Sequence, residues 1–231
     1  LQLIWNQRKQ NAWLWAELLL VSVFLWFLVD YLYVMGRTYT APLGFDIRHT
    51  YSIVISSLSE RSPDYIPKEK RERPDGVHLL TALDRIRTYP GVESACLTDG
   101  GMPYYMGSRN LVWRIDTLQV PCRYAFVTPE FFDVFRIYDK EGETASLKRA
   151  IEDNNSIVIS ADVETMNPGL SLLGQKAYRG NVTDEIEETI RGISVPIRRH
   201  EYTKAEPNVY RALRLSRMEE GYYEGMIDAV R

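Results

Sequence analysis

Few residues of this chain have the types and spacing that catalysis or metal binding requires. The three histidines, His49, His78 and His200, are far apart in sequence and lack the spacing of metal ligands. No G-x-x-x-x-G-K-[ST] loop is present to hold phosphates, and no G-x-S-x-G turn is present to hold a nucleophilic serine. We therefore predict no enzyme, no metal and no cofactor on this chain, although acid–base residues that meet only after folding stay open.

Two acidic residues, Glu17 and Asp30, lie toward the two ends of the most apolar segment. A charge at the centre of a bilayer costs about 2.5–3.5 kcal/mol, and the cost falls toward the interfaces. We favour an interfacial position in which both side chains reach the headgroup region. The alternative is that they pair with another membrane helix and couple its movement to this one.

Aromatic side chains gather at residues 102–107, MPYYMG, where Tyr104 and Tyr105 lie beside a proline and two methionines. They could pack as core at the base of a loop, or form an adaptable contact for a hydrophobic cargo or a partner protein. The sequence favours neither interpretation.

The two cysteines, Cys96 and Cys122, lie in apolar, strand-like surroundings. Their surroundings favour two small buried hydrophobes, and a disulfide is the alternative if the domain lies outside the cytoplasm.

The apolar segment at residues 13–35 predicts a membrane-spanning helix. At 1.5 Å per residue it covers roughly 34 Å, enough for a hydrocarbon core of about 30 Å. Tryptophan and tyrosine flank it on both sides, and Arg8 and Lys9 favour a cytoplasmic N-terminus. Residues 1–12 form either a short interfacial helix or an extension of the span. A buried core helix and a signal peptide are the alternatives to the span.

The remaining residues have the composition of a globular domain, or of two small ones. The chain of 231 residues is 45% hydrophobic and 26% charged, with a net charge of −3. The dense charge run at residues 68–73, KEKRER, mixes both signs and suits a solvated loop. We therefore expect no nucleic-acid partner.

The first half of the domain reads as a β-α-β unit. Alternating apolar residues predict a strand at 49–58, and VESACL predicts another at 92–97. Between them, apolar residues at helical spacing predict a helix that Asp75 caps and that ends before Pro90-Gly91. A helical crossover makes two neighbouring strands parallel.

The second half is richer in strands. We predict strands at 110–116, 118–127, 156–160 and 188–197, and a helix-like segment at 161–166. Thr128-Pro129-Glu130 should cap a short helix at 130–137. A last helix-like segment, 218–231, ends with the sequence, so we expect the chain to be a fragment of a longer protein.

Three segments in order resemble one family. The segment LLTALDRIRTYPGVESA (79–95) is similar to a helix–"PGV"–strand unit, and FVTPEFFDVFRI (126–137) resembles "VTPEYFEVLGI". The segment from Ser156 to Ala177, followed by ETIRGISVPI, parallels "VVINEALA … PIGK.I … IVGVVKD". Together they resemble an FtsX-like/MacB-like ABC transporter permease. The glycine and aspartate usual in the "GVVKD" strand are replaced by Gly192-Ile193-Ser194-Val195-Pro196, and the "aGR" element is reduced to DKEGET (139–144), so this is a divergent example.

The resemblance implies an α+β fold in which one transmembrane helix precedes a periplasmic domain of two subdomains. A porter-like part would comprise residues 44–100 and 205–231, and an inserted β-rich part would comprise residues 101–204. The protein would lie in the bacterial inner membrane with its main domain in the periplasm.

The resemblance also implies a role in transport or mechanotransmission. ATP would bind a separate cytoplasmic ABC ATPase subunit, and a second permease copy would complete a dimer. A periplasmic or outer-membrane partner protein is a further expectation. The alternative function is the outer sensing domain of a membrane-anchored receptor such as a histidine kinase. The two differ in the segments expected after Arg231, which would be several more spans in a permease and one span with a coiled coil in a kinase.

Overall fold

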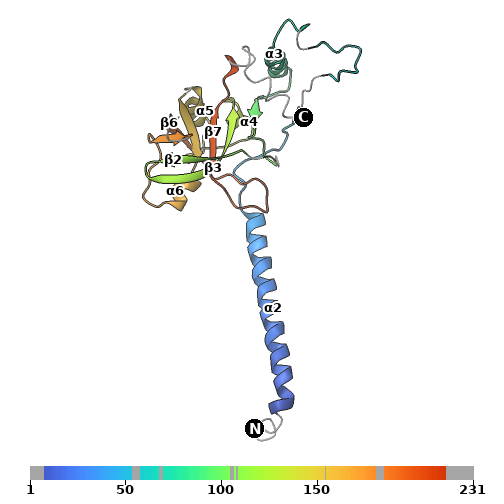
Figure 1. Cartoon of the computed structure of the whole chain (residues 1–231), viewed down its shortest axis with the longest axis vertical. Coiled ribbons are helices and arrows are strands. Elements are labelled where there is room, and N and C mark those ends of the chain that lie inside the picture. The colour runs from blue at the N-terminus through green and yellow to red at the C-terminus, as the bar shows by residue number, and fades with distance from the viewer. Residues whose placement is uncertain are drawn as a thin grey trace. The chain divides into compact units, whose positions relative to one another are not determined.

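The computed structural model describes residues 8–53, 58–67, 70–104, 107, 109–153, 155–180 and 185–216 (Figure 1). The chain divides into two compact units. The first comprises residues 1–42 with 201–204, and the second comprises residues 43–200 with 205–231.

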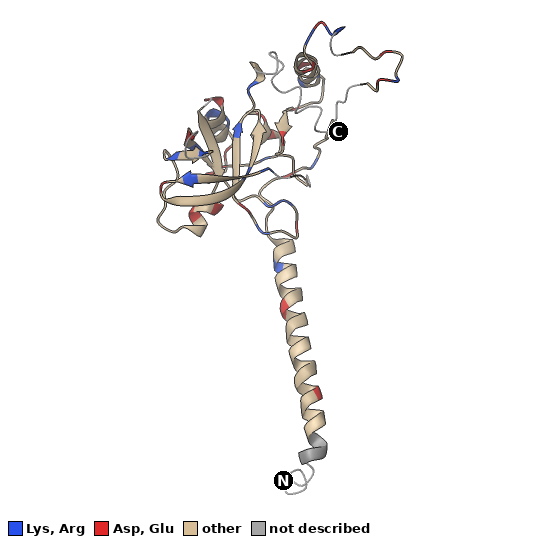
Figure 2. Cartoon of the chain, in the orientation of Figure 1, with Lys and Arg blue, Asp and Glu red and all other residues tan. Residues whose placement is uncertain are grey.

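Helix α2 (Arg8–Thr40) dominates the first unit, and it confirms the helix predicted at residues 13–35. Its segment Ala12–Thr40 is long and apolar enough to cross a membrane, and it contains an 18-residue stretch with a mean hydropathy of 2.2. Every side chain from residue 12 to residue 34 is exposed, so the apolar surface of the helix is not used for packing within the described chain. Figure 2 shows how few charges the helix carries along its length.

A closed ring of strands forms the centre of the second unit. The strands are β2 (Asn110–Ile115), β3 (Leu118–Val127), β4 (Ser156–Ser160), β5 (Lys176–Arg179), β6 (Ile186–Ser194) and β7 (Asn208–Ala212). They follow the order β3-β2-β5-β6-β4-β7, and a parallel pairing of β7 with β3 closes the ring. Within the described residues this is therefore a six-stranded barrel.

The interior of the barrel is one apolar cluster. Because successive side chains of a strand point to opposite faces, alternate residues of β2 and β3 enter it. Trp113, Ile115, Ile157, Ile159 and Ile190 are all completely buried there. Helix α6 (Asp162–Met166) contributes Val163 to the same cluster.

A second cluster covers the outer face of the barrel. Helix α4 (Phe131–Val134) supplies Phe131 and Phe132, and helix α5 (Ala145–Glu152) supplies Leu147 and Ile151. All four side chains are at most 1% exposed. The two helices therefore anchor residues 131–152 firmly on the barrel.

The predicted β-α-β unit is only partly present. Helix α3 (Asp75–Arg87) confirms the predicted helix. The predicted strand at 92–97 is wrong, because these residues are irregular and the adjacent strand β1 (Thr98–Asp99) pairs antiparallel with β3. The Leu97 carbonyl instead accepts a hydrogen bond from the Thr128 amide, and the Leu97 amide donates to the Thr128 hydroxyl. Both backbone groups of Leu97 are therefore paired without a run of strand hydrogen bonds. Of the earlier strand, residues 54–57 lie outside the described residues and 51–53 are irregular.

Both predicted helix caps are also wrong. Pro74 is the cap residue of α3, and Asp75 lies within the helix, where it accepts a 2.6 Å hydrogen bond from Arg71. Glu130 takes the cap position of α4, while the Thr128 hydroxyl accepts a bond from the Leu97 amide.

The second half of the domain largely confirms the predicted elements. The hairpin β2–β3, the strands β4 and β6, and the helices α4 and α6 lie where the sequence predicts them, although α4 is shorter. Strand β7 completes the barrel, although the predicted division assigns it to the porter-like part. The division into 44–100, 101–204 and 205–231 stays a prediction. Residues 218–231 lie outside the described residues.

Candidate functional site

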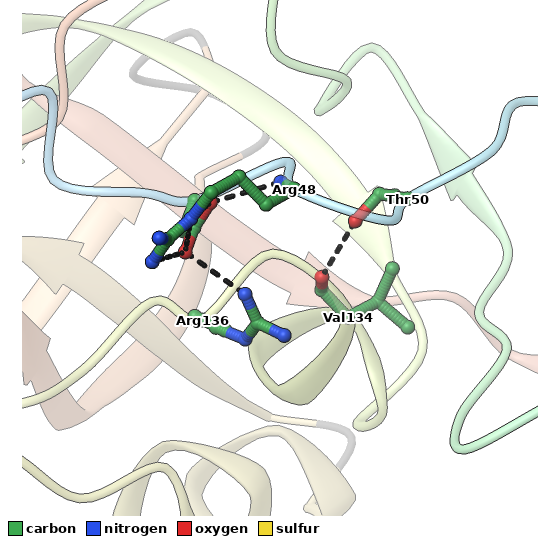
Figure 3. A network of polar contacts seen from close by, with 5 residues as sticks. Arg48, Thr50, Val134 and Arg136 are labelled. Atoms are coloured by element: carbon green, nitrogen blue, oxygen red, sulfur yellow. Dashed lines mark hydrogen bonds and ion pairs between the residues drawn. The ribbon is translucent and has the colours of Figure 1, made fainter.

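A short segment, residues 43–50, follows the membrane-length helix and is held against the rest of the second unit. We call it the strap. The Leu43 carbonyl accepts a 3.0 Å bond from the Arg198 amide, and the Asp46 amide donates a 2.9 Å bond to the Phe135 carbonyl. At the far end the Thr50 hydroxyl donates to the Val134 carbonyl at 3.4 Å (Figure 3). The strap is therefore tied at both ends and in the middle.

Gly44 lets the strap approach the domain closely. Its φ is +84°, a left-handed conformation that glycine adopts without penalty. A Cβ atom at this position would lie 2.1 Å from the Pro196 carbonyl oxygen and 3.2 Å from the Ile197 Cα. Any other residue would therefore force the strap away from residues 196–197.

The Asp46 carboxylate lies between two arginines. Arg48, which belongs to the strap, places a guanidinium nitrogen 2.8 Å from an Asp46 carboxylate oxygen. Arg136, which follows α4, also places a guanidinium nitrogen 2.8 Å from Asp46. Figure 3 shows dashed lines from both guanidinium groups to the same carboxylate. The hydrogen bonds from Arg48 and then from Arg136 hold the pKa of Asp46 well below its ordinary value.

Arg136 occupies a conformation that side chains rarely adopt. Its φ is +50°, directly after the last residues of α4, where helices commonly end on glycine. The left-handed conformation costs about 1–2 kcal/mol for a residue with a Cβ. In this conformation the Arg136 guanidinium forms an ion pair with Asp46. We infer that this ion pair offsets part of the conformational cost.

A small pocket lies beside the strap. Phe45 of the strap, the turn at 100–104, strands β3 and β7, and residues 197–199 surround it. Its deep residues include Ile137, Ala125 and Tyr210, which are 1%, 3% and 4% exposed. Three arginines also line it, namely Arg123, Arg198 and Arg199.

The structure places Tyr104 at this pocket and leaves Tyr105 outside the described residues. Tyr104 is 40% exposed, and its ring meets that of Phe45 edge to face at 5.8 Å. Its backbone has a φ of +60°, and its amide donates to the Arg199 carbonyl at 3.4 Å. Tyr104 is thus neither a core residue nor an isolated surface residue, and a role as contact residue stays a prediction.

The membrane-helix candidates Glu17 and Asp30 are both exposed on α2. They are thirteen positions apart, which is about 20 Å along the axis and a rotation of about 220°. They therefore cannot pair with each other, and any charged partner must come from elsewhere. Their coupling role stays a prediction.

The cysteines are free thiols in the structure. Cys122 is buried inside the barrel and Cys96 is half-buried against the outer cluster. Burial raises the pKa of each thiol to about 12. Within the described residues, no group of three or more His, Cys, Asp or Glu side chains could hold a metal ion.

The sequence matches no family model and no curated protein. Solved structures do resemble the fold in part. One is a domain of a protein described as a permease, from Porphyromonas gingivalis, with 20% identity, a TM-score of 0.42, and coverage of 58% of this chain and 50% of that one.

Two further structures are a periplasmic region and an extracellular domain. The periplasmic region of MacB from Actinobacillus actinomycetemcomitans has 10% identity and a TM-score of 0.40, covering 58% of this chain and 54% of that one. The extracellular domain of the ABC-type transporter YknZ from Gram-positive bacteria has 12% identity and a TM-score of 0.42, covering 61% of this chain and 65% of that one. The chain thus matches between half and two thirds of the length of each.

The sequence analysis predicted no site at Gly44, Asp46 or Arg136. The glycine two residues after Pro42 was a turn signal, but nothing local indicated its contact with Pro196. Asp46 and Arg136 are 90 residues apart, so their pairing carries no sequence signal.

Proposed function

We propose that this chain is the membrane-anchored, extracytoplasmic part of an ABC transporter permease, in which the domain moves in response to ATP hydrolysis on a separate cytoplasmic subunit. The single observation that carries the proposal is the spacing between the helix and the strap. Helix α2 ends at Thr40 and the strap begins at Leu43, so two residues separate a membrane-length helix from a segment fixed to the domain.

So short a connection leaves little slack. A flexible linker of many residues would absorb a displacement of the helix before it reached the domain. Here the strap is fixed by backbone hydrogen bonds at Leu43 and Asp46 and by the Asp46–Arg136 ion pair. A shift or rotation of the helix would therefore move the domain.

The segments at 79–95, 126–137 and 156–197 support the same proposal through their resemblance to MacB-like permeases. A second permease copy would complete the transporter. A periplasmic or outer-membrane protein would receive the movement.

The test uses the full-length natural protein, purified with its co-purifying subunits and placed in lipid nanodiscs. Spin labels at Arg37→Cys and Glu141→Cys report the distances between helix and domain within one copy and across the pair, and the two native thiols should stay unlabelled because they are shielded. We expect ATP hydrolysis by the complex and a change in the label distance between the ADP-bound and ATP-bound states.

A matched complex whose ATPase subunit binds but cannot hydrolyse ATP should stay in one distance state. If the purified protein shows no ATP hydrolysis and instead supports transfer of phosphate to a histidine, the receptor alternative is correct. If the distance is the same in every nucleotide state, the proposed movement is wrong.

A further inference from the structure

The pocket beside the strap is rich in positive charge. Arg123, Arg198 and Arg199 line it, and an acid near them is Glu206, 3.9 Å from Arg199 and with 53% of its side chain exposed. We propose that this pocket binds a carboxylate group on an acidic side chain of a partner protein. This inference goes beyond the proposed function, because it rests on the pocket and not on a transport role.

Two buried donors in the pocket lack acceptors. The Nε–H groups of Arg123 and Arg199 are buried and have no hydrogen-bond partner among the described residues. Buried polar groups in native proteins are nearly always paired, so an orphaned donor requires an explanation such as a missing ligand or water. Two such donors, on two arginines that line one pocket, point to an acceptor that contacts both.

The electrostatics favour an anion in this position. Burial and the neighbouring charge of Arg199 lower the pKa of the Arg123 guanidinium. A negative group between the two arginines would reverse this effect. Guanidinium groups bind carboxylates through parallel N–H···O bonds, which are stronger than neutral hydrogen bonds.

The size of the pocket selects the kind of anion. Its volume is about 30 Å³. A cavity needs roughly 10–15 Å³ of this kind for one water, so the pocket holds about two water-sized groups. The two oxygens of a carboxylate fit this space, whereas the four oxygens of a phosphate would extend out of the pocket. Small-molecule pockets measure about 300–1,000 Å³, so a free cargo molecule of that size would not be enclosed.

The rim of the pocket points to a protein as the source of the carboxylate. Met102 and Tyr104 are 37% and 40% exposed there, and both line the pocket. Methionine, tyrosine and arginine are enriched in protein–protein interfaces, where aromatic residues surround a desolvated anchor. The exposed rim would contact the partner's backbone next to the acidic side chain.

The experiment measures the Arg Nε–H resonances of the full chain in detergent micelles by NMR. The probes are acetyl-Ala-Glu-Ala-amide, the matched acetyl-Ala-Gln-Ala-amide, sodium acetate and sodium phosphate, all at constant ionic strength. We expect the glutamate peptide to shift the Arg123 and Arg199 resonances saturably. Its affinity should exceed that of the glutamine peptide and of acetate by at least tenfold.

Variants identify the responsible side chains. Arg199→Gln and Arg123→Gln should each weaken binding of the glutamate peptide at least tenfold, while Arg199→Lys should retain part of it. The control Arg191→Gln removes an exposed arginine that pairs with Asp153, and it should bind as the parent chain does. Thermal unfolding of each variant verifies that it folds. If Arg199→Gln does not fold, Arg199→Lys replaces it as the test of binding.

Each contrary result overturns a defined part of the inference. No saturable shift with any probe means that the pocket holds water alone. Equal affinity for acetate and the peptide would mean that the partner is a small carboxylate and not a protein. Equal affinity for phosphate would exclude the carboxylate preference. None of these results depends on ATP hydrolysis, so they are distinguishable from failure of the proposed function.

Discussion

Gly44 and Pro196 approach so closely that a Cβ atom on the glycine would lie 2.1 Å from the proline carbonyl oxygen. This contact fixes the start of the strap to the segment that follows β6. The strap is thus a defined part of the domain.

Gly44→Ala should destabilise the domain by about 2–3 kcal/mol, because it combines a strained φ with a backbone clash. Urea unfolding of the full chain in detergent measures the loss. Gly142→Ala is the matched control, since Gly142 has a φ of +89° with open space around it. It should cost only about 1–2 kcal/mol. Equal losses in the two variants would mean that the strap yields without cost.

The Asp46 carboxyl should remain ionised at a pH where ordinary aspartates are mostly protonated. Its pKa in the folded state lies below the unfolded value of about 3.9. Its contribution to stability is therefore complete above that value and is lost only as the pH falls through the lower folded pKa. Carbon-detected NMR titration of the carboxyl groups provides the measurement.

Two arginine variants separate the causes of this shift. Arg48→Gln should raise the Asp46 pKa more than Arg136→Gln does, because hydrogen bonds from Arg48 are the largest cause of the shift. If the order is reversed, the bond across to α4 dominates the network.

Glu188→Gln should cost about 3 kcal/mol of stability, since it leaves two arginines at one end of the barrel without a counter-charge. Glu188 is 3% exposed and pairs with Arg211 at 2.5 Å and with Arg179 at 3.4 Å. The adjacent Glu187 pairs with Lys176 in a more exposed position and supplies the control. Glu187→Gln should cost less than about 1 kcal/mol. Chemical unfolding curves of both variants test the difference.

Neither cysteine should react with iodoacetamide in the folded protein at pH 8. A thiol with a pKa of about 12 is almost entirely protonated there, and the thiolate is the reactive form. Both should react after unfolding in urea, as intact-mass spectrometry would show. Labelling of either residue in the native state would indicate local opening of the barrel or of its outer cluster.

Glu17→Gln and Asp30→Asn test the remaining membrane candidates. If these acids pair with other helices of an assembly, each change should lower ATP hydrolysis by the complex or the yield of assembled complex. Asp84→Asn, at an exposed position of α3, is a control for the general effect of losing an acid. Wild-type assembly and hydrolysis in both variants would leave the two acids with an interfacial role only.

The sequence predicted correctly those helices and strands whose residues show a clear periodicity of their own. The long apolar helix, the hairpin around Asp116-Thr117 and the buried strand SIVIS all have a periodicity that a few residues determine. Helix α5 had such a signal too, because Leu147, Ala150 and Ile151 recur at helical spacing, but the sequence interpretation overlooked it. Strand β5 has four residues and is defined by its neighbours β2 and β6, so its own sequence could not reveal it.

The errors come from contacts between distant residues. VESACL has the composition of a strand, but these residues are irregular in the structure. Cys96 packs against the outer cluster without belonging to a strand. The pocket unites residues from position 45 to position 210, and no pattern in the sequence sets its arginines apart. Of the predicted contact residues, Tyr104 lies at this pocket. The proposed carboxylate binding would make Tyr104 part of the rim that contacts the partner.

The closure of the barrel by β7 has a consequence for the order of synthesis. Residues 208–212 are the last of the ring to leave the ribosome, and they fill the gap between β3 and β4. Until they arrive, both neighbouring strands have an unpaired edge, which is the kind of surface that recruits other nascent chains. A polypeptide terminated before residue 208 should therefore be degraded or aggregate, however complete its other strands are.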